Sequence, residues 1–425
     1  MRTPAATTML LGFLTTFLYV PVPCPGQQTP LPTELSGNPY VIRDVWRIGG
    51  EGTWDYVTLD PVAEQLLIAH SNQVQIVDLT SGREIASIPG IGEARDIVLD
   101  PSGEYGYVSD AKMAMVRVFS RSTQRIVASV PTGPSPRALV FEPLTQLLFV
   151  ICAAPVVATP EATAPEGQTR NPRNPPKPPP VKSLINVIET RKWTSVGEFE
   201  VSGRLGFAQA DRNGHIFVNV EDRKSVVRFN AADVAQQLRS PATANNPASP
   251  APASPDPTNP ALTAATPLPF DHLMRRLMLS SECEEPSALA VDDTHMRLFV
   301  ACNNGRLEII NADNGTPVAA LPIGYDTGTV AYDANHSLIF TANGGGDGSL
   351  TVIRQHVTDT YEVIQQLDTM PRARTMAENP ATGRAYMVTD IYGYDLSQPS
   401  GIGTLKTYPM PGSFEALVID HFSGR

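Results

Sequence analysis

The stretch RLFVACNNGRLEIINADNGTPVAALPIG, from Arg297 to Gly324, contains three apolar runs separated by turn residues. Asn303-Asn304-Gly305 separates the first two runs, and Asn314-Gly315 separates the second from the third. Asn-Gly favours a tight turn between strands because both residues tolerate positive φ angles. The stretch therefore predicts a three-stranded antiparallel meander, with Cys302 at its first turn.

The same pattern recurs along the chain at intervals of about forty residues. Segments that begin at Gln65 and Tyr105 match the stretch strand by strand, and LLFVICAAP from Leu147 repeats RLFVACNNG. An acidic or Asn residue marks the end of the first strand of each unit: Asp60, Asp100, Glu142, Asp211, Asp292, Asp333 and Asn379. Successive markers are 40, 42, 69, 81, 41 and 46 residues apart. Two intervals are therefore too long for a single unit.

Two low-complexity inserts account for the long intervals. They run from Ala154 to Lys182 and from Ser240 to Pro269, and both are rich in Pro, Ala and Thr. Such a composition cannot bury a core, so it predicts extended, disordered chain. Each insert is either a partner-binding arm or a tolerated surface insertion, and the sequence leaves both interpretations open.

Seven repeats of four short strands are typical of a β-propeller, in which each blade buries both faces against its neighbours. The last unit lacks a fourth strand, and YVIRDVWRI, Tyr40 to Ile48, supplies one beside Phe414–Ile419. This pairing would remove both sheet edges and close the ring. No convincing amphipathic helix of normal length is found after the N-terminal segment. We therefore predict an all-β fold over residues 40–425: a seven-bladed β-propeller of four-stranded antiparallel blades.

These strands resemble the YVTN-repeat, or YncE-like, family of seven-bladed propellers. Variants of its second-strand tetrapeptide are YVSD at Tyr107, FVAC at Phe299, FTAN at Phe340 and MVTD at Met387. The resemblance covers about Tyr40 to Arg425 outside the inserts. The fourth unit departs most from it, because it lacks the usual turn and leads into the second insert. The resemblance implies an exported or surface-associated binding propeller and brings no shared catalytic motif.

The N-terminal 26 residues have the pattern of a secretory signal. Arg2 gives a positive start, and Met9 to Val20 form an apolar stretch too short to span a bilayer. Cys24 and Gly26 are suitable for cleavage near Gly26, which would leave residues 27–39 as a linker. We expect an exported monomer in the periplasm, at the cell surface or in the medium. An uncleaved anchor and a lipoprotein at Cys24 are the alternatives.

Three cysteines remain after this cleavage, so at most one disulfide can form within the chain. Cys152 and Cys302 occupy equivalent positions in different units and should be too far apart to bond. A Cys283–Cys302 bond requires the segment Glu284-Glu285-Pro286 to fold back. Otherwise Cys152 and Cys302 act as small apolar fillers.

Binding residues of a propeller converge on the face formed by the loops between blades and by the loops between second and third strands. Arginines recur in the inter-blade loops, where clustered guanidinium groups would bind carboxylate or phosphate through forked hydrogen bonds. Alternatively, each arginine pairs with a nearby acid. The predicted ligand-binding residues are Trp54, Asp55, His70, Arg95, Asp96, Arg137, Arg204, Asp326, Arg372 and Arg374. His70 is the one histidine expected on this face, as a ligand contact, a general base or a strand cap.

We expect a non-catalytic binding scaffold for a protein, a peptide or a small anionic ligand, without a cofactor. The net charge of −11 argues against a nucleic-acid surface built on bulk charge. Motifs for haem attachment, a zinc helix, a phosphate loop or a nucleophile elbow are absent. The alternative is a lactonase-like hydrolase or metal-dependent enzyme with its site at the channel. His70 with Asp110, or a cluster of Asp55, Asp96 and Glu285, would then supply the base or the metal ligands.

Overall fold

The computed structural model describes residues 39–152, 181–240, 270–357, 359–395 and 406–421. The chain divides into two units, Met1–Ser36 and Gly37–Arg425, and the first lies outside the described residues. The predicted signal segment and its cleavage point lie there too, as do nearly all residues of the two predicted inserts. Lys182, which we expected to end the first insert, instead begins a strand.

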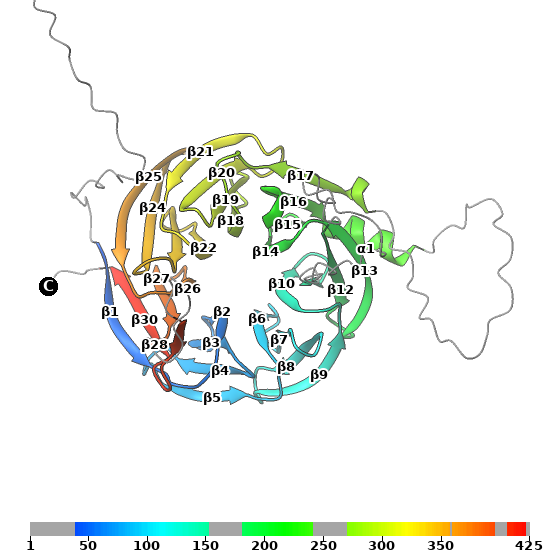
Figure 1. Cartoon of the computed structure of the whole chain (residues 1–425). Coiled ribbons are helices and arrows are strands. Elements are labelled where there is room, and N and C mark those ends of the chain that lie inside the picture. The colour runs from blue at the N-terminus through cyan, green and yellow to red at the C-terminus, as the bar shows by residue number, and fades with distance from the viewer. Residues whose placement is uncertain (1–38, 153–180, 241–269, 358, 396–405, 422–425) are drawn as a thin grey trace, which may run out of the picture. The chain divides into compact units, whose positions relative to one another are not determined.

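The unit Gly37–Arg425 contains seven four-stranded antiparallel sheets arranged in a ring, which confirms the predicted β-propeller (Figure 1). Blades are numbered here in chain order, each from its innermost strand outward. Blade one contains β2 (Trp54–Asp60), β3 (Gln65–His70), β4 (Gln73–Asp78) and β5 (Glu84–Ile88). Blade two contains β6 (Ala94–Leu99), β7 (Tyr105–Asp110), β8 (Met115–Ser120) and β9 (Arg125–Pro131). Blade three contains β10 (Pro136–Glu142), β11 (Leu147–Cys152), β12 (Lys182–Glu189) and β13 (Thr194–Ser202).

The remaining blades follow the same order, with one addition in the last. Blade four contains β14 (Leu205–Ala210), β15 (His215–Val220), β16 (Ser225–Asn230) and β17 (Met274–Met278). Blade five contains β18 (Pro286–Asp292), β19 (Arg297–Cys302), β20 (Arg306–Asn311) and β21 (Pro317–Pro322). Blade six contains β22 (Thr327–Asp333), β23 (Leu338–Asn343), β24 (Ser349–Val357) and β25 (Thr360–Asp368). Blade seven contains β26 (Thr375–Asn379), β27 (Arg384–Thr389), β30 (Glu415–His421) and β1 (Tyr40–Arg47). A separate hairpin, β28 (Tyr392–Asp395) and β29 (Lys406–Pro409), lies between β27 and β30 in the chain.

The fourth blade contains a helix, α1 (Ala231–Arg239), which the strand pattern did not predict. Asn230 ends β16 and also caps the helix, because its Oδ1 accepts hydrogen bonds from the amides of Ala232 and Asp233 at 2.9 and 3.2 Å. Val234 is buried against the blade. Two short 3-10 turns, η1 (Glu221–Arg223) and η2 (Asp271–Leu273), complete the helical residues of the described part of the chain.

The predicted ring closure is confirmed by the strand order β26–β27–β30–β1. Strand β1 pairs antiparallel with β30, from Tyr40 opposite His421 to Arg47 opposite Glu415. Trp46 on β1 packs against Tyr386, with ring centroids 5.5 Å apart, and reaches blade one at Gly82. A Cβ at Gly82 would lie 2.4 Å from the indole. The N-terminal strand therefore completes blade seven and contacts blade one.

The repeated acidic marker has a local structural role in the turn after each innermost strand. Asp292 shows the pattern: its Oδ1 accepts hydrogen bonds from the amides of Thr294 and His295, both at 3.1 Å. Side chains of all seven markers accept backbone amide hydrogens in this way. The carboxylates of Asp211, Asp292 and Asp333 also bind the nearby imidazoles of His215, His295 and His336. These histidines lie near the turns that follow the innermost strands, at the opposite strand ends from the inter-blade loops.

Neighbouring innermost strands are joined by side chain–backbone hydrogen bonds. Thr58 of blade one donates to the carbonyl of Ile97 in blade two at 2.6 Å. Ser287 of blade five donates to the carbonyl of Thr327 in blade six, also at 2.6 Å. Because backbone hydrogen bonds run within each blade, these contacts fix the positions of the strands that surround the channel.

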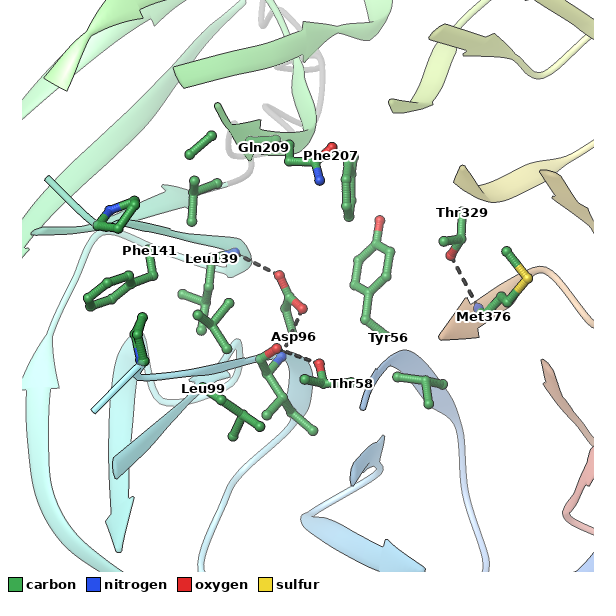
Figure 2. Close-up of a pocket in the computed structure, with 18 residues that line it drawn as sticks. Tyr56, Thr58, Asp96, Leu99, Leu139, Phe141, Phe207, Gln209, Thr329 and Met376 are labelled. Atoms are coloured by element: carbon green, nitrogen blue, oxygen red, sulfur yellow. Dashed lines mark hydrogen bonds between the residues drawn. The ribbon is translucent and has the colours of Figure 1, made fainter. Parts of the chain in front are cut away.

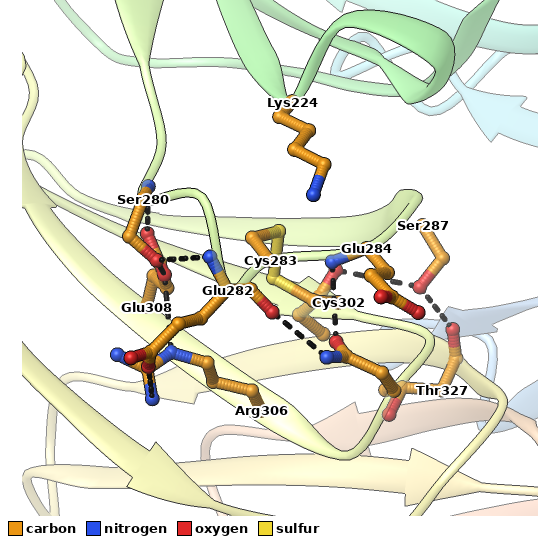
Figure 3. Close-up of a disulfide and its surroundings, with 12 residues drawn as sticks. Lys224, Ser280, Glu282, Cys283, Glu284, Ser287, Cys302, Arg306, Glu308 and Thr327 are labelled. Atoms are coloured by element: carbon orange, nitrogen blue, oxygen red, sulfur yellow. Dashed lines mark hydrogen bonds and ion pairs between the residues drawn. A yellow bond between two sulfur atoms is a disulfide. The ribbon is translucent and has the colours of Figure 1, made fainter.

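Cys283 and Cys302 form a disulfide in blade five, with their Cα atoms 5.3 Å apart (Figure 3). The required fold-back of the intervening segment is present, because the Asn303 amide donates to the carbonyls of Glu284 and Glu285 at 2.9 and 3.2 Å. Both cysteines are fully buried. Cys152 is a buried free thiol. The disulfide therefore fastens an inter-blade loop to the end of β19.

Replacing Trp46 with Ala should lower the free energy of unfolding by about 3–5 kcal/mol, because the substitution leaves a cavity where the indole packs between blades seven and one. The measurement is urea denaturation followed by circular dichroism. Val45→Ala is the matched control: Val45 is the preceding residue on β1 and is 42% exposed, whereas Trp46 is 8% exposed. Equal losses for the two variants would contradict this role for Trp46.

Removing the disulfide should lower the free energy of unfolding by about 3 kcal/mol, because its closed loop restricts the unfolded chain. The sequence separation of the cysteines is 19 residues. The Cys283→Ala/Cys302→Ala variant and the reduced wild-type protein should show the same loss in urea denaturation. Adding reductant to the double variant should change nothing. An unchanged unfolding midpoint for reduced wild-type protein would refute the prediction.

Candidate functional site

A cavity of about 590 Å³ opens at the channel mouth, on the face formed by the inter-blade loops. It is called the mouth cavity below. Its lining residues are Thr53, Trp54, Asp55, Glu93, Arg95, Arg137, Asp326, Arg372, Arg374, Thr375 and Tyr392. Seven of the ten predicted ligand-binding residues are among them. The inter-blade loops therefore bring together side chains from blades one, two, three, six and seven.

The repeated backbone of the innermost strands explains this convergence. Asp55, Arg95 and Arg137 each follow the first paired residue of their strand, where the pairing register shifts. Such a bulge redirects a side chain and is common next to binding sites. Arg374 immediately precedes β26 and takes the corresponding place in blade seven.

Blades four to six have small residues at the corresponding position: Gly206, Ser287 and Gly328. At Gly328, a Cβ would lie 2.6 Å from the carbonyl oxygen of Arg374 and 3.0 Å from its Nε. Glycine is therefore needed here for Arg374 to pack across the strand. At this strand position, the ring therefore has charged residues on one side and small residues on the other.

The arginines of the mouth cavity have different partners. Arg95 forms ion pairs with Asp55 at 3.1 Å and Glu93 at 2.6 Å. Arg374 forms one with Asp326 at 2.6 Å. These two guanidinium groups are therefore held in place by carboxylates.

The other two arginines lack such close carboxylates among the described residues. Arg137 approaches Glu221 only to 3.9 Å. Arg372 donates to the Thr407 hydroxyl at 2.7 Å and lies over the Tyr392 ring, 4.1 Å from its centroid. Both side chains retain hydrogen-bonding capacity toward the cavity, since a guanidinium group has five N–H donors.

Burial raises the pKa of Asp55, while the nearby charges of Arg137 and Arg95 oppose the shift. For Arg137, burial alone would lower the pKa, but Tyr56, Asp55 and Glu221 together raise it. Burial also raises the pKa of Tyr56 above its usual value. Around neutral pH, Arg137 is therefore charged, and the Tyr56 hydroxyl remains protonated.

A second cavity, of about 450 Å³, lies around the inner parts of the same strands (Figure 2). Tyr56 from blade one and Phe207 from blade four approach each other there, with ring centroids 5.3 Å apart. Because these blades are not neighbours in the ring, their contact narrows the channel. The other lining residues are mainly apolar.

Asp96 lines this lower cavity and not the mouth cavity. Its carboxylate accepts hydrogen bonds from the amides of Ile97 and Leu139, both at 2.8 Å. The Leu139 bond joins blade two to blade three. Burial raises the pKa of Asp96 to about 7, although these hydrogen bonds favour the charged form.

His70 and Arg204 line neither cavity. His70 is 1% exposed; its Nδ1 hydrogen-bonds Gln75 Oε1 at 2.6 Å, and its ring centroid lies 4.3 Å from that of Phe414. Arg204 forms ion pairs with Glu221 at 2.6 Å and Glu285 at 2.9 Å. His70 is therefore enclosed, and Arg204 lies outside the mouth cavity in a charged cluster that shares Glu221 with Arg137.

In the described residues, the two side chains named for acid–base chemistry, His70 and Asp110, have other hydrogen-bonding partners. Asp110 accepts hydrogen bonds from the amides of Gly92 and Glu93 and pairs with Arg117, whereas His70 binds Gln75. No group of three His, Cys, Asp or Glu side chains suited to a metal ion occurs in the part of the chain that the structure describes. In the same residues, no helix is both long enough and apolar enough to span a membrane.

The sequence analysis missed Glu93 and Tyr392 in the mouth cavity. Glu93 lies two residues before Arg95 in an inter-blade loop, a position that could have identified it as an ion-pair partner. Tyr392 lies in the hairpin inserted into blade seven, outside the four-strand repeat. No other blade has an equivalent position, so comparison of the repeats could not indicate the role of Tyr392.

Comparison with protein-family models and with curated proteins finds no match. Solved structures with a similar fold include U3-55K, with TM-score 0.58 and 9% identity over 89% of this chain and 98% of that chain. The RRP9 WD40 repeats give TM-score 0.57 and 9% identity over 83% and 92%. Hydrazine synthase from Kuenenia stuttgartiensis gives TM-score 0.52 and 15% identity over 73% and 86%. At these identities, the likeness shows the propeller fold alone.

Asp96 should make the stability of the protein depend on pH. Its pKa is raised in the folded state, so its contribution to folding becomes less favourable as the pH rises from about 4 to about 7 and is then constant. Asp96→Asn should remove this dependence. The free energy of unfolding of the variant should therefore lie further below that of wild type at pH 5 than at pH 8. The expected change in that difference is on the order of a few kcal/mol.

Urea denaturation at several pH values between 4 and 9 measures the effect. Asp100→Asn is a suitable control, because Asp100 accepts a turn amide but lies outside the lower cavity. A difference between wild type and Asp96→Asn that does not vary with pH would contradict the prediction.

Proposed function

We propose that this chain is a binding propeller that captures an anionic group of its ligand in the mouth cavity. The observation that carries the proposal is the gathering of Arg95, Arg137, Arg372 and Arg374 around one cavity. Guanidinium groups suit carboxylates and phosphates because their planar N–H donors match the geometry of these anions. The ligand is therefore a small organic anion or the anionic end of a peptide.

The composition of the mouth cavity supports this assignment. Four arginines face three acids among its lining residues, which leaves one excess positive charge when all are ionised. Trp54 and Tyr392 add aromatic surface, with ring centroids 6.2 Å apart. The volume of about 590 Å³ is in the usual range for small-molecule sites. The cavity can thus combine charge recognition with apolar contact.

The ion pairs favour binding by a preformed site. Asp55 and Glu93 hold Arg95, and Asp326 holds Arg374. A side chain already fixed in its bound geometry loses less conformational entropy when a ligand arrives. A non-catalytic role accords with this arrangement, because its charged groups are committed to orientation and charge recognition.

We also propose membership of the YVTN-repeat, or YncE-like, family and export from the cytoplasm. Seven four-stranded blades and the strand motifs support the family assignment. The signal-like N-terminal sequence supports export, as does the Cys283–Cys302 disulfide, because disulfides persist mainly in oxidising compartments. The chain would then act as a monomeric binding protein outside the cytoplasm.

The Arg95→Ala/Arg137→Ala variant should bind citrate at least about tenfold more weakly than wild type, because it loses two guanidinium groups and exposes neighbouring acids. Citrate binding can be measured by calorimetry and by quenching of Trp54 fluorescence. Trp54→Phe should abolish the optical signal but retain the calorimetric one. Citrate and inorganic phosphate serve as anionic probes.

Arg223→Ala is the matched control for loss of positive charge. Arg223 is exposed on η1 and does not line the mouth cavity. This variant should bind the probes as wild type does at equal ionic strength. Unchanged binding by the Arg95/Arg137 variant would reject the proposed function, as would the failure of folded wild-type protein to bind any carboxylate or phosphate.

A further inference from the structure

The two incompletely paired arginines of the mouth cavity come from separated blades. Arg137 is the second residue of the inner strand of blade three, while Arg372 lies in the loop before blade seven. Blades one and two lie between these positions around the ring, and they contribute Asp55 and Arg95 to the cavity. The cavity therefore has two separate guanidinium positions with donors available to a ligand.

The other two arginines of the mouth cavity, Arg95 and Arg374, form close ion pairs and are therefore less available to an anionic ligand. Arg95 is held by two carboxylates, and Arg374 is held by one at 2.6 Å. An anion approaching either group would also meet the carboxylate that pairs with it. Arg137 lies near Asp55 and approaches Glu221 to 3.9 Å, but it forms no ion pair as short as those of Arg95 and Arg374, and Arg372 has hydroxyl and aromatic partners. Charge recognition is thus most favourable at Arg137 and Arg372.

The backbone supports a defined position for Arg372. Its φ angle is 64°, in the left-handed region that non-glycine residues rarely occupy. Its amide donates to the carbonyl of Gly344 at 2.9 Å, and its own carbonyl accepts from the amide of Arg374 at 2.8 Å. A Cβ at Gly344 would lie 3.1 Å from the Arg372 Cα. These contacts hold the loop in an uncommon conformation next to the cavity.

We propose that the mouth cavity binds a dicarboxylate, with one carboxylate at Arg137 and the other at Arg372. This inference rests on the proposed anion-binding function and specifies its ligand class. Two linked contacts strengthen binding because the second forms at a high effective concentration when the linker matches the separation of the sites. The linker lies in the middle of the cavity.

The residues between the two positions favour an uncharged linker. Asp55 lies on blade one, between Arg137 and Arg372, and would repel a third anionic group when ionised. Trp54 adjoins it in sequence and offers an aromatic surface to methylene groups. The cavity thus has anion-binding positions separated by a region better suited to apolar atoms.

The test is calorimetric titration of full-length protein with α,ω-dicarboxylates from succinate to suberate and with monocarboxylates of matching chain length. The best dicarboxylate should bind at least about tenfold more tightly than its monocarboxylate match, with an optimum at one length. Arg137→Ala and Arg372→Ala should each reduce its affinity to the monocarboxylate level. The double variant should bind neither class detectably.

Arg223→Ala controls for general loss of charge, and urea denaturation confirms that each variant is folded. Equal affinities for dicarboxylates and monocarboxylates at every length would overturn the inference but leave anion capture intact. The same conclusion would follow if inorganic phosphate bound as tightly as the best dicarboxylate and Arg372→Ala had no effect. Absence of binding by every carboxylate and by citrate and phosphate would reject both the inference and the proposed function.

Discussion

The antiparallel pairing of β1 with β30 is the constraint on which the mouth cavity depends. Blade seven obtains its fourth strand from the opposite end of the propeller sequence. Trp46 then contacts Gly82 of blade one, which fixes the two blades beside each other. Arg374 and Asp55 belong to these same two blades and line one cavity. Closing the ring therefore also assembles the charged side of the channel mouth.

The repeat forms the fold, and departures from the repeat form the candidate site. The innermost strands of blades one to six begin with the same register shift, and Arg374 precedes β26 at the corresponding place in blade seven. This position is nevertheless occupied by Asp55, Arg95, Arg137 and Arg374 on one side of the ring and by glycine or serine on the other. A symmetric ring can thus have an asymmetric mouth without any change in its blades. The small residues provide space for charged side chains from neighbouring positions to lie across the strands, as Gly328 does for Arg374.

Local periodicity predicted what is local in this structure, the strands and the acidic turn markers, and the missing fourth strand of the last repeat indicated the closing strand. It missed α1 because Asn230 ends a strand and caps a helix of only nine residues. It placed His70 on the binding face but could not reveal that the ring is buried, with a hydrogen bond to Gln75 and a contact with Phe414. The contact between Tyr56 and Phe207 joins non-neighbouring blades, so no single repeat contains it. The strand repeat could locate the mouth cavity, but the pairing of its charges required the three-dimensional structure.

A net charge of −11 is compatible with an anion site because charge acts locally in water. Exposed charges beyond a Debye length, about 8 Å at physiological ionic strength, are largely screened. Within the mouth cavity, Asp55, Glu93 and Asp326 orient two arginines and partly neutralise them. The same acids disfavour anions at those positions, which leaves Arg137 and Arg372 as the more attractive ones. Acidic residues can therefore increase the selectivity of an arginine-lined cavity, because they restrict where an anionic group can bind.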